Sequence, residues 1–127
     1  MTKHIVRTDK APTPVGPYSQ GTKVGNLVFV SGQGPFDSNT GKIIGNDISS
    51  QTRRTLENVK AILEASGLTM GDVVTVSVFL KTPEDFHGMN ETYKIFFPEN
   101  PPTRTTVVAG FVAPSMLIEV NAIAYRE

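Results

Sequence analysis

The segment DVVTVSVFLKTPEDFHGMNETYKIFF, residues 72–97, places a strand-like run directly before a helix-like run. Its first part, Asp72–Lys81, is rich in β-branched residues and is predicted to form a strand. Threonine, proline and acidic residues follow, and this composition is typical of a helix N-terminus. Large apolar residues then recur at helical spacing, which predicts an amphipathic helix that packs them into the core. They are Phe86, Met89, Tyr93, Phe96 and Phe97.

The regions on either side predict further strands and one more helix. Leu27–Gly34 is a short apolar run closed by glycines, which is typical of a buried strand. From Ile48 the apolar residues keep helical spacing, with Asn46 or Asp47 placed to cap the first turn and Gly67 placed to end the helix. Two further strands are expected after the opening segment, at Arg104–Phe111 and Leu117–Arg126.

The N-terminal region is expected to hold one strand around His4, followed by an irregular arm at residues 11–26 that prolines and glycines break into turns. The predicted order is therefore β-β-α-β-α-β-β within a single domain, residues 1–127. This order indicates an α+β fold with a mixed or antiparallel sheet and both helices packed on one face. The opposite face is then uncovered, and because its residues are too apolar for full exposure, we expect a homo-oligomer.

The composition disfavours several classes of function. The chain has 12 basic and 12 acidic residues, so no net charge attracts it to nucleic acid or to an anionic membrane. It has no cysteine and only two histidines, His4 and His87, so no metal site is expected. The N-terminus lacks the apolar core of a signal peptide, and no apolar run is long enough to span a bilayer. We therefore expect a cytoplasmic protein.

Two charged residues lie inside the predicted strands. Alternation puts Arg104 on the same face of its strand as Thr106. In the last strand the small apolar residues fit the helix-covered face, so Glu119 and Asn121 are expected to point to the uncovered face. We expect Arg104 and Glu119 to look into the same space. Either they form a structural ion pair or sit on solvated edges, or the arginine binds a substrate carboxylate with its planar fork while the glutamate handles protons or holds a water. Residue spacing leaves both interpretations open.

Six ordered segments resemble the RidA/YjgF family of reactive-intermediate deaminases, also known as the translation-inhibitor or L-PSP endoribonuclease family. They are GPYSQG (16–21), VSGQGP (30–35), QTRRTLENVKAILEASG (51–67), MNETYKIFF (89–97), PPTRTTV (101–107) and IEVNAIA (118–124). The resemblance implies a chorismate-mutase-like α+β fold of the ferredoxin-like type, assembled as a homotrimer with sites between subunits. It also implies cofactor-free hydrolysis of enamines or imines, such as 2-aminoacrylate, to 2-oxo acids and ammonia.

The resemblance also assigns roles by position. It gives the carboxylate-binding role to Arg104 and the water-orienting role to Glu119. Thr106 stands where several family members have cysteine, and Asn121 replaces a frequent acid, so these departures bear on substrate preference. The residues that match the lining of the family's pocket are Tyr18, Ser31, Gly32, Asn90 and Thr106.

Two other functions are open at this level. An endoribonuclease or translation inhibitor is disfavoured by the zero net charge and by the absence of an aromatic and basic strand platform. A non-catalytic sensor of small carboxylates, or a chaperone-like protein, would need the arginine but not Glu119. Serine catalysis is disfavoured because no histidine or lysine is placed to activate Ser31, and the glycosylation sequon at Asn90 is interpreted as a chance match.

Overall fold

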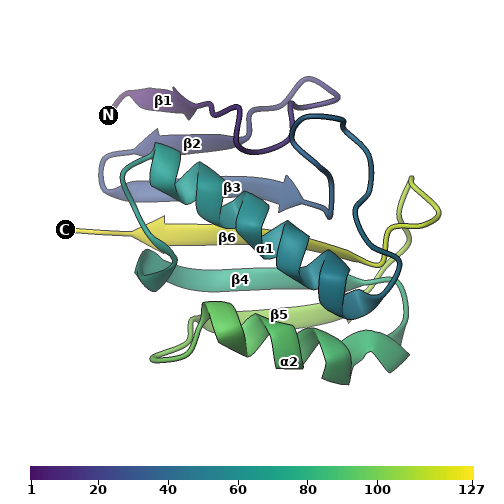
Figure 1. The fold of residues 1–127 in the computed structure, drawn as a ribbon. Helices are drawn as coiled ribbons and strands as arrows, with labels where there is room; N and C mark the ends of the chain where they lie inside the picture. Colours follow the sequence, from purple (N-terminus) through teal and green to yellow (C-terminus); the bar gives the residue numbers. More distant parts are fainter.

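The computed structural model describes residues 1–127 and contains one six-stranded sheet with two helices on one of its faces (Figure 1). The strand order is β1-β2-β3-β6-β4-β5, and only the β4–β5 pair is parallel, which confirms the predicted mixed sheet. The strands are β1 (Lys3–Val6), β2 (Gly21–Val24), β3 (Leu27–Gln33), β4 (Val73–Leu80), β5 (Thr103–Val108) and β6 (Ile118–Tyr125). The helices are α1 (Ile48–Ala65) and α2 (Phe86–Phe96), with short 3₁₀ turns at Met70–Asp72 and Pro83–Asp85.

Helix α1 begins and ends where its sequence signals predict. Asp47 is the N-cap, and its side chain accepts a hydrogen bond from the Ser50 backbone N–H at 2.8 Å. Gly67 follows the helix with a φ of 88°, a left-handed conformation that glycine adopts without strain. Neither α1 nor α2 has the length and the apolar character that a membrane span requires.

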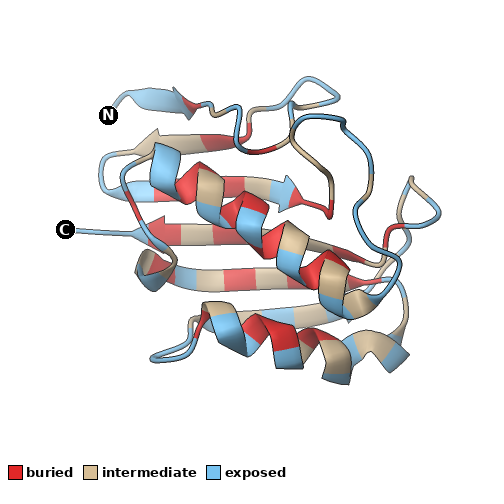
Figure 2. Ribbon diagram, viewed as in Figure 1, coloured by how far each residue is buried: buried red, intermediate tan, exposed pale blue.

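The core lies between the two helices and the covered face of the sheet (Figure 2). In β6 every second residue from Ile118 to Ala124 is buried, and the residues between them are only half-buried. Leu56 and Ile62 of α1 are fully buried in the same cluster. The uniformly apolar side of β6 therefore faces the helices, and Glu119 points away from them, as predicted.

Three details of the predicted elements are wrong. The arm at 11–26 is not wholly irregular, because β2 forms within it and pairs antiparallel with both β1 and β3. Its four residues are too few and too polar to give an apolar pattern, and pairing with its neighbours stabilises it. The strand predicted to reach Phe111 ends at Val108, where a loop begins. Phe86 is 46% exposed and does not belong to the core.

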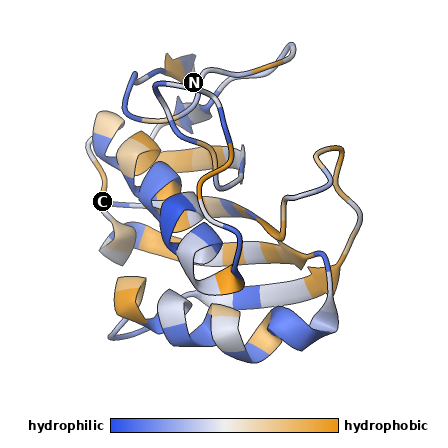
Figure 3. Ribbon diagram, turned by 45° about the vertical axis from the view of Figure 1, so that its right-hand side comes forward, coloured by the Kyte–Doolittle hydropathy of each residue, from blue (hydrophilic) through white to orange (hydrophobic).

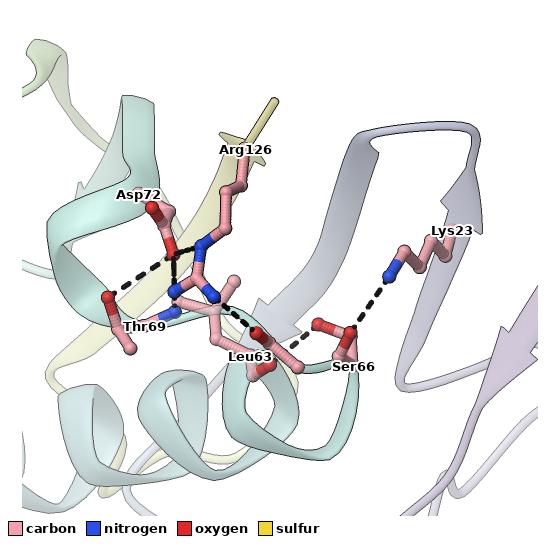
Figure 4. Close-up of polar contacts among 7 residues, drawn as sticks. Lys23, Leu63, Ser66, Thr69, Asp72 and Arg126 are labelled. Atoms are coloured by element: carbon pink, nitrogen blue, oxygen red, sulfur yellow. Dashed lines mark hydrogen bonds and ion pairs between the residues drawn. The ribbon is translucent and has the colours of Figure 1, made fainter.

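The C-terminal end of β6 is fastened to the segment that follows α1 (Figure 4). Arg126 Nη2 and Nε lie 2.6 and 3.0 Å from Asp72 Oδ2, and Nη1 donates to the Gly67 carbonyl at 3.0 Å. The hydrogen bond from Arg126 lowers the pKa of Asp72. The stabilisation from this pair is thus present above the pKa of Asp72 in the unfolded chain and is lost as the pH falls through its folded-state pKa.

The uncovered face of the sheet carries exposed apolar side chains. Leu27 and Phe29 alternate with the buried Val28 and Val30 along β3, so they point away from the helices. Their exposed fractions are 37% and 38%, and that of Val107 on β5 is 44%. The loop between β5 and β6 adds further hydrophobic residues at one end of the sheet (Figure 3). Association with other copies would remove this surface from water.

Candidate active site

Arg104 lies near the start of the edge strand β5, and its side chain points to the helix-covered face. Its Cα is paired with that of the buried Val76, which fixes this orientation. The guanidinium carbon lies 4.8 Å from the ring centroid of Tyr93 and 5.6 Å from that of Phe86, and Nη1 lies 3.9 Å from the Met89 sulfur. Burial raises the pKa of Tyr93, so the ring stays neutral beside the cation. No carboxylate of the chain forms an ion pair with Arg104.

Thr106 and Asn90 lie on the same side as Arg104, and we call these three residues the arginine cluster. Thr106 is paired with the buried Val78, and its own buried hydroxyl has no hydrogen-bond partner. Asn90 is half-buried on α2, four residues after Phe86, so the two side chains share one face of the helix. The cluster combines a fixed positive charge with two polar side chains at the edge of the sheet.

Glu119 lies on the opposite face of the sheet, beside Gly32. It alternates with the buried Ile118 and Val120, and its Cα is paired with that of Phe79. A Cβ built on Gly32 would lie 2.5 Å from Glu119 Oε2, so the carboxylate occupies space that only glycine leaves open. Burial raises the pKa of Glu119, and no neighbouring cation opposes that shift.

Tyr18 and Ser31 lie on the same side as Glu119 and Gly32, and we call these four residues the glutamate cluster. Tyr18, Gly32 and Glu119 line a pocket of about 750 Å³. The Ser31 hydroxyl donates to the Ser19 carbonyl at 2.5 Å, a bond that supports the loop and leaves the serine unactivated. The rest of the pocket wall comes from the arm at 12–15, the loop at 33–41 and the loop at 110–116.

The two clusters lie on opposite faces of the sheet, so the expectation that Arg104 and Glu119 share one space is wrong within a single chain. Arg104 on β5 is paired with Val76 on β4, which is paired with Ala122 on β6. Arg104 and Glu119 are therefore two strands apart across the sheet and three residues apart along it. At roughly 3.3 Å per residue and roughly 4.8 Å per strand, the two Cα atoms are about 14 Å apart along the sheet. An ion pair between them within one chain is therefore excluded. Neither charge is neutralised, and each is free to act on a ligand.

Sequence reasoning missed the surroundings of both charges. Tyr93 lies in the core as predicted and Phe86 does not, and together their rings form the surface on which Arg104 lies. Their spacing of seven residues on α2 was the available signal, because it places both rings on one helix face. The two histidines lie on β1 and α2, and no three His, Cys, Asp or Glu side chains are grouped closely enough to hold a metal ion.

Replacing Gly32 with alanine is expected to lower the activity of the site without unfolding the chain. The new methyl group would collide with the Glu119 carboxylate and displace it, which lowers activity. The chain should stay folded because the backbone at Gly32 is not in a left-handed conformation and so accepts alanine. Initial rates of substrate turnover and a thermal melt would measure the two effects. Gly71→Ala is the matched control, because its added Cβ meets only Thr69 Oγ1, at an ordinary 3.6 Å. Equal rates for the two variants would contradict the assignment of Glu119 to the site.

Comparison with known proteins places the chain in a family. The family model described as Endoribonuclease L-PSP matches residues 8–126. A RutC family protein of Pyrococcus abyssi is 50% identical over 127 residues, which cover 100% of both chains. The 2-iminobutanoate/2-iminopropanoate deaminase of Salmonella typhimurium is 45% identical over 129 residues, which cover 99% of both chains.

Solved structures agree with this placement. Escherichia coli TdcF with bound serine has a TM-score of 0.92 at 42% identity, over 98% of this chain and 99% of that one. The YjgF gene product of Escherichia coli has a TM-score of 0.90 at 42% identity, with the same coverage of 98% and 99%. The chain therefore belongs to the RidA/YjgF family, some of whose members are named imine deaminases.

Proposed function

We propose that this protein hydrolyses reactive enamines and imines of small 2-amino acids, such as 2-aminoacrylate, to 2-oxo acids and ammonia. The observation that carries the proposal is the pair of half-buried, unpaired charges, Arg104 and Glu119. Unpaired charges away from bulk water cost stability, so their persistence favours a role in binding or catalysis. The names of the related deaminases supply the reaction class.

The complete site forms between subunits of a homotrimer. The arginine and glutamate clusters lie on opposite faces of one sheet, so one ligand meets both only where two copies join. A contact between two different surfaces is heterologous, and it closes into a ring when the rotation between copies permits. The apolar residues on the uncovered face provide the surface that such a ring would bury.

In this site each group has one task. Arg104 binds the substrate carboxylate with two parallel hydrogen bonds and stays charged at any working pH. The enamine takes a proton on carbon and becomes an iminium, whose carbon is electrophilic. Glu119 orients a water molecule, accepts its proton as oxygen adds to that carbon, and returns a proton to the nitrogen. The C–N bond then breaks as Glu119 takes the hydroxyl proton and the C=O bond forms, so the products are the 2-oxo acid and ammonia, which becomes ammonium on taking up that proton. Tyr18, Gly32, Asn90 and Thr106 shape the space around the substrate.

The pH profile provides a test of the base. Glu119 must be ionised to accept a proton, and burial raises its pKa above that of an exposed glutamate. As the pH falls through this raised pKa, kcat/KM is therefore expected to fall. The midpoint of this fall, the acid limb of the pH profile, should lie at a higher pH than the ordinary pKa of an exposed glutamate. Initial rates of ammonia release across pH, with coupling enzymes in excess, measure this limb. An acid limb at or below the ordinary value would exclude a buried carboxylate base.

The test of the function itself is ammonia release from 2-aminoacrylate generated in situ by a desaturating enzyme. Wild-type protein is expected to raise the rate of release above that of the free-solution reaction in proportion to its concentration. No acceleration at any protein concentration would overturn the proposal. The solution mass, measured by light scattering, tests the trimer independently.

RNA cleavage is the second candidate, because the family model bears the description of an endoribonuclease. A zero net charge counts against a phosphate-binding surface. Incubation with RNA at increasing salt, with wild type and the Arg104→Ala variant side by side, separates the two functions. Cleavage that persists in the variant would arise from another site or from a contaminant.

A further inference from the structure

Three of the four buried carboxamide side chains hydrogen-bond only to backbone groups outside the helices and the six strands. Gln20, Gln51 and Asn58 are 4%, 0% and 0% exposed. Each binds backbone groups far from it in sequence, and none pairs with another side chain. A buried polar group is costly unless its hydrogen bonds are made, so these contacts determine where the three side chains are tolerated.

Gln51, in the first turn of α1, uses both ends of its amide. Nε2 donates to the carbonyls of Gly45 and Ser115 at 3.0 and 2.9 Å, and Oε1 accepts from the Leu117 N–H at 2.8 Å. These bonds tie the segment before α1 to the end of the loop at 110–116, which forms one wall of the pocket. Leu117 lies two residues before Glu119, so the same bonds fix the entry to β6.

Gln20 holds a second wall with both ends of its amide, and Asn58 holds the third with its Nδ2 alone. Asn58 Nδ2 donates to the carbonyls of Gly34 and Phe36 at 3.0 and 2.9 Å, in the loop at 33–41. Gln20 Nε2 donates to the Pro12 carbonyl at 2.9 Å, and its Oε1 accepts from the Thr8 N–H at 2.8 Å. The arm that Gln20 holds continues into residues 12–15 of the pocket wall.

We infer that Gln20, Gln51 and Asn58 are positioning residues, each of which holds one wall of the pocket that contains Glu119. The inference rests on the proposed function for its consequences in catalysis. The chemistry fits the task, because an irregular loop leaves backbone carbonyls and N–H groups unpaired. A carboxamide supplies two donors and an acceptor without adding a charge beside the buried glutamate. The arm at 12–15 and the loops at 33–41 and 110–116 are thereby held in a single conformation around the pocket.

The test replaces Gln51 with methionine, which keeps the volume and removes every hydrogen bond. Without those bonds the loop at 110–116 is expected to open and to admit water to Glu119. The expected result is a fall in kcat/KM of about 100-fold, the effect of misplacing a site by about 1 Å. The acid limb of the pH profile should move down towards the ordinary glutamate value, because the carboxylate becomes hydrated. If the methionine variant does not fold, Gln51→Asn replaces it in the same measurements, because it shortens the side chain by one methylene group and moves the amide away from its partners.

The matched control is Val59→Ala, a core truncation on the same helix at a residue that does not line the pocket and makes no side-chain hydrogen bond to its walls. It is expected to lower the melting temperature while kcat/KM and the pH profile stay unchanged at temperatures where it is folded. Hydrogen exchange gives a readout that does not depend on catalysis. Gln51→Met should speed exchange in residues 110–117, and Val59→Ala should not.

The outcomes separate the two proposals. Unchanged exchange at 110–117 in Gln51→Met, or an equal loss of kcat/KM in Val59→Ala, would overturn the positioning role. Wild-type protein without deaminase activity would overturn the proposed function and leave the exchange test of the pocket walls intact.

Discussion

Replacing Arg104 with alanine is expected to lower kcat/KM for imine hydrolysis by about 30- to 5000-fold while the chain stays folded. Loss of one partner from a hydrogen-bonded charge pair costs about 2–5 kcal/mol, and each 1.36 kcal/mol is a tenfold change in rate. Folding should survive, because Arg104 forms no ion pair within the chain and its guanidinium lies against Phe86, Met89 and Tyr93 without a charged partner. Ammonia release and circular dichroism measure the two properties.

Two further variants make this result specific. Arg104→Lys keeps the charge and loses the planar fork, so its activity should lie between those of wild type and the alanine variant. Arg53→Ala removes the same charge from the exposed face of α1 and should leave activity unchanged. A rate for Arg104→Ala equal to that of Arg53→Ala would remove the anchor of the proposed mechanism.

The sequence was sufficient to predict the face of Glu119 but not that of Arg104. In β6 the alternate residues from Ile118 to Ala124 are all small or apolar, so their side had to face the helices. The edge strand β5 has no such contrast, because threonine and valine occur on both of its faces. Only its parallel pairing with β4, a contact distant in sequence, orients Arg104. The alternation of side chains along a strand correctly placed Arg104 and Thr106 on one face, but it did not determine whether that face is covered by the helices.

The walls of the pocket were beyond prediction for a related reason. Helical periodicity sorts apolar from polar residues, and it assigns Gln51 and Asn58 to the solvent side by their polarity. Both are fully buried, because carbonyl groups from loops at 34–36, 45 and 115 meet them in the folded chain. Nothing in the local sequence shows that those loops converge. Buried polar residues are satisfied by long-range contacts, and a single sequence does not display these.

Mixing two inactive variants is expected to restore activity, because each supplies the half of the site that the other lacks. Glu119→Gln should still bind a 2-oxo acid through Arg104, measured by calorimetry, and should lose turnover because an amide does not accept the proton. Arg104→Ala keeps Glu119 intact. When the two are unfolded together and refolded, about one quarter of the interfaces in a random cyclic assembly combine an intact arginine with an intact glutamate.

The restored activity should therefore approach about one quarter of the wild-type value, a gain that no site within one chain produces. The control mixes Arg104→Ala with the double variant Arg104→Ala, Glu119→Gln, in which no interface contains an intact arginine, and it should stay inactive. Within one chain, Arg104 and Glu119 lie on opposite faces of the sheet and two strands apart. A mixture as inactive as its components, in assemblies shown by mass to contain both chains, would mean that Arg104 and Glu119 do not act on the same substrate molecule.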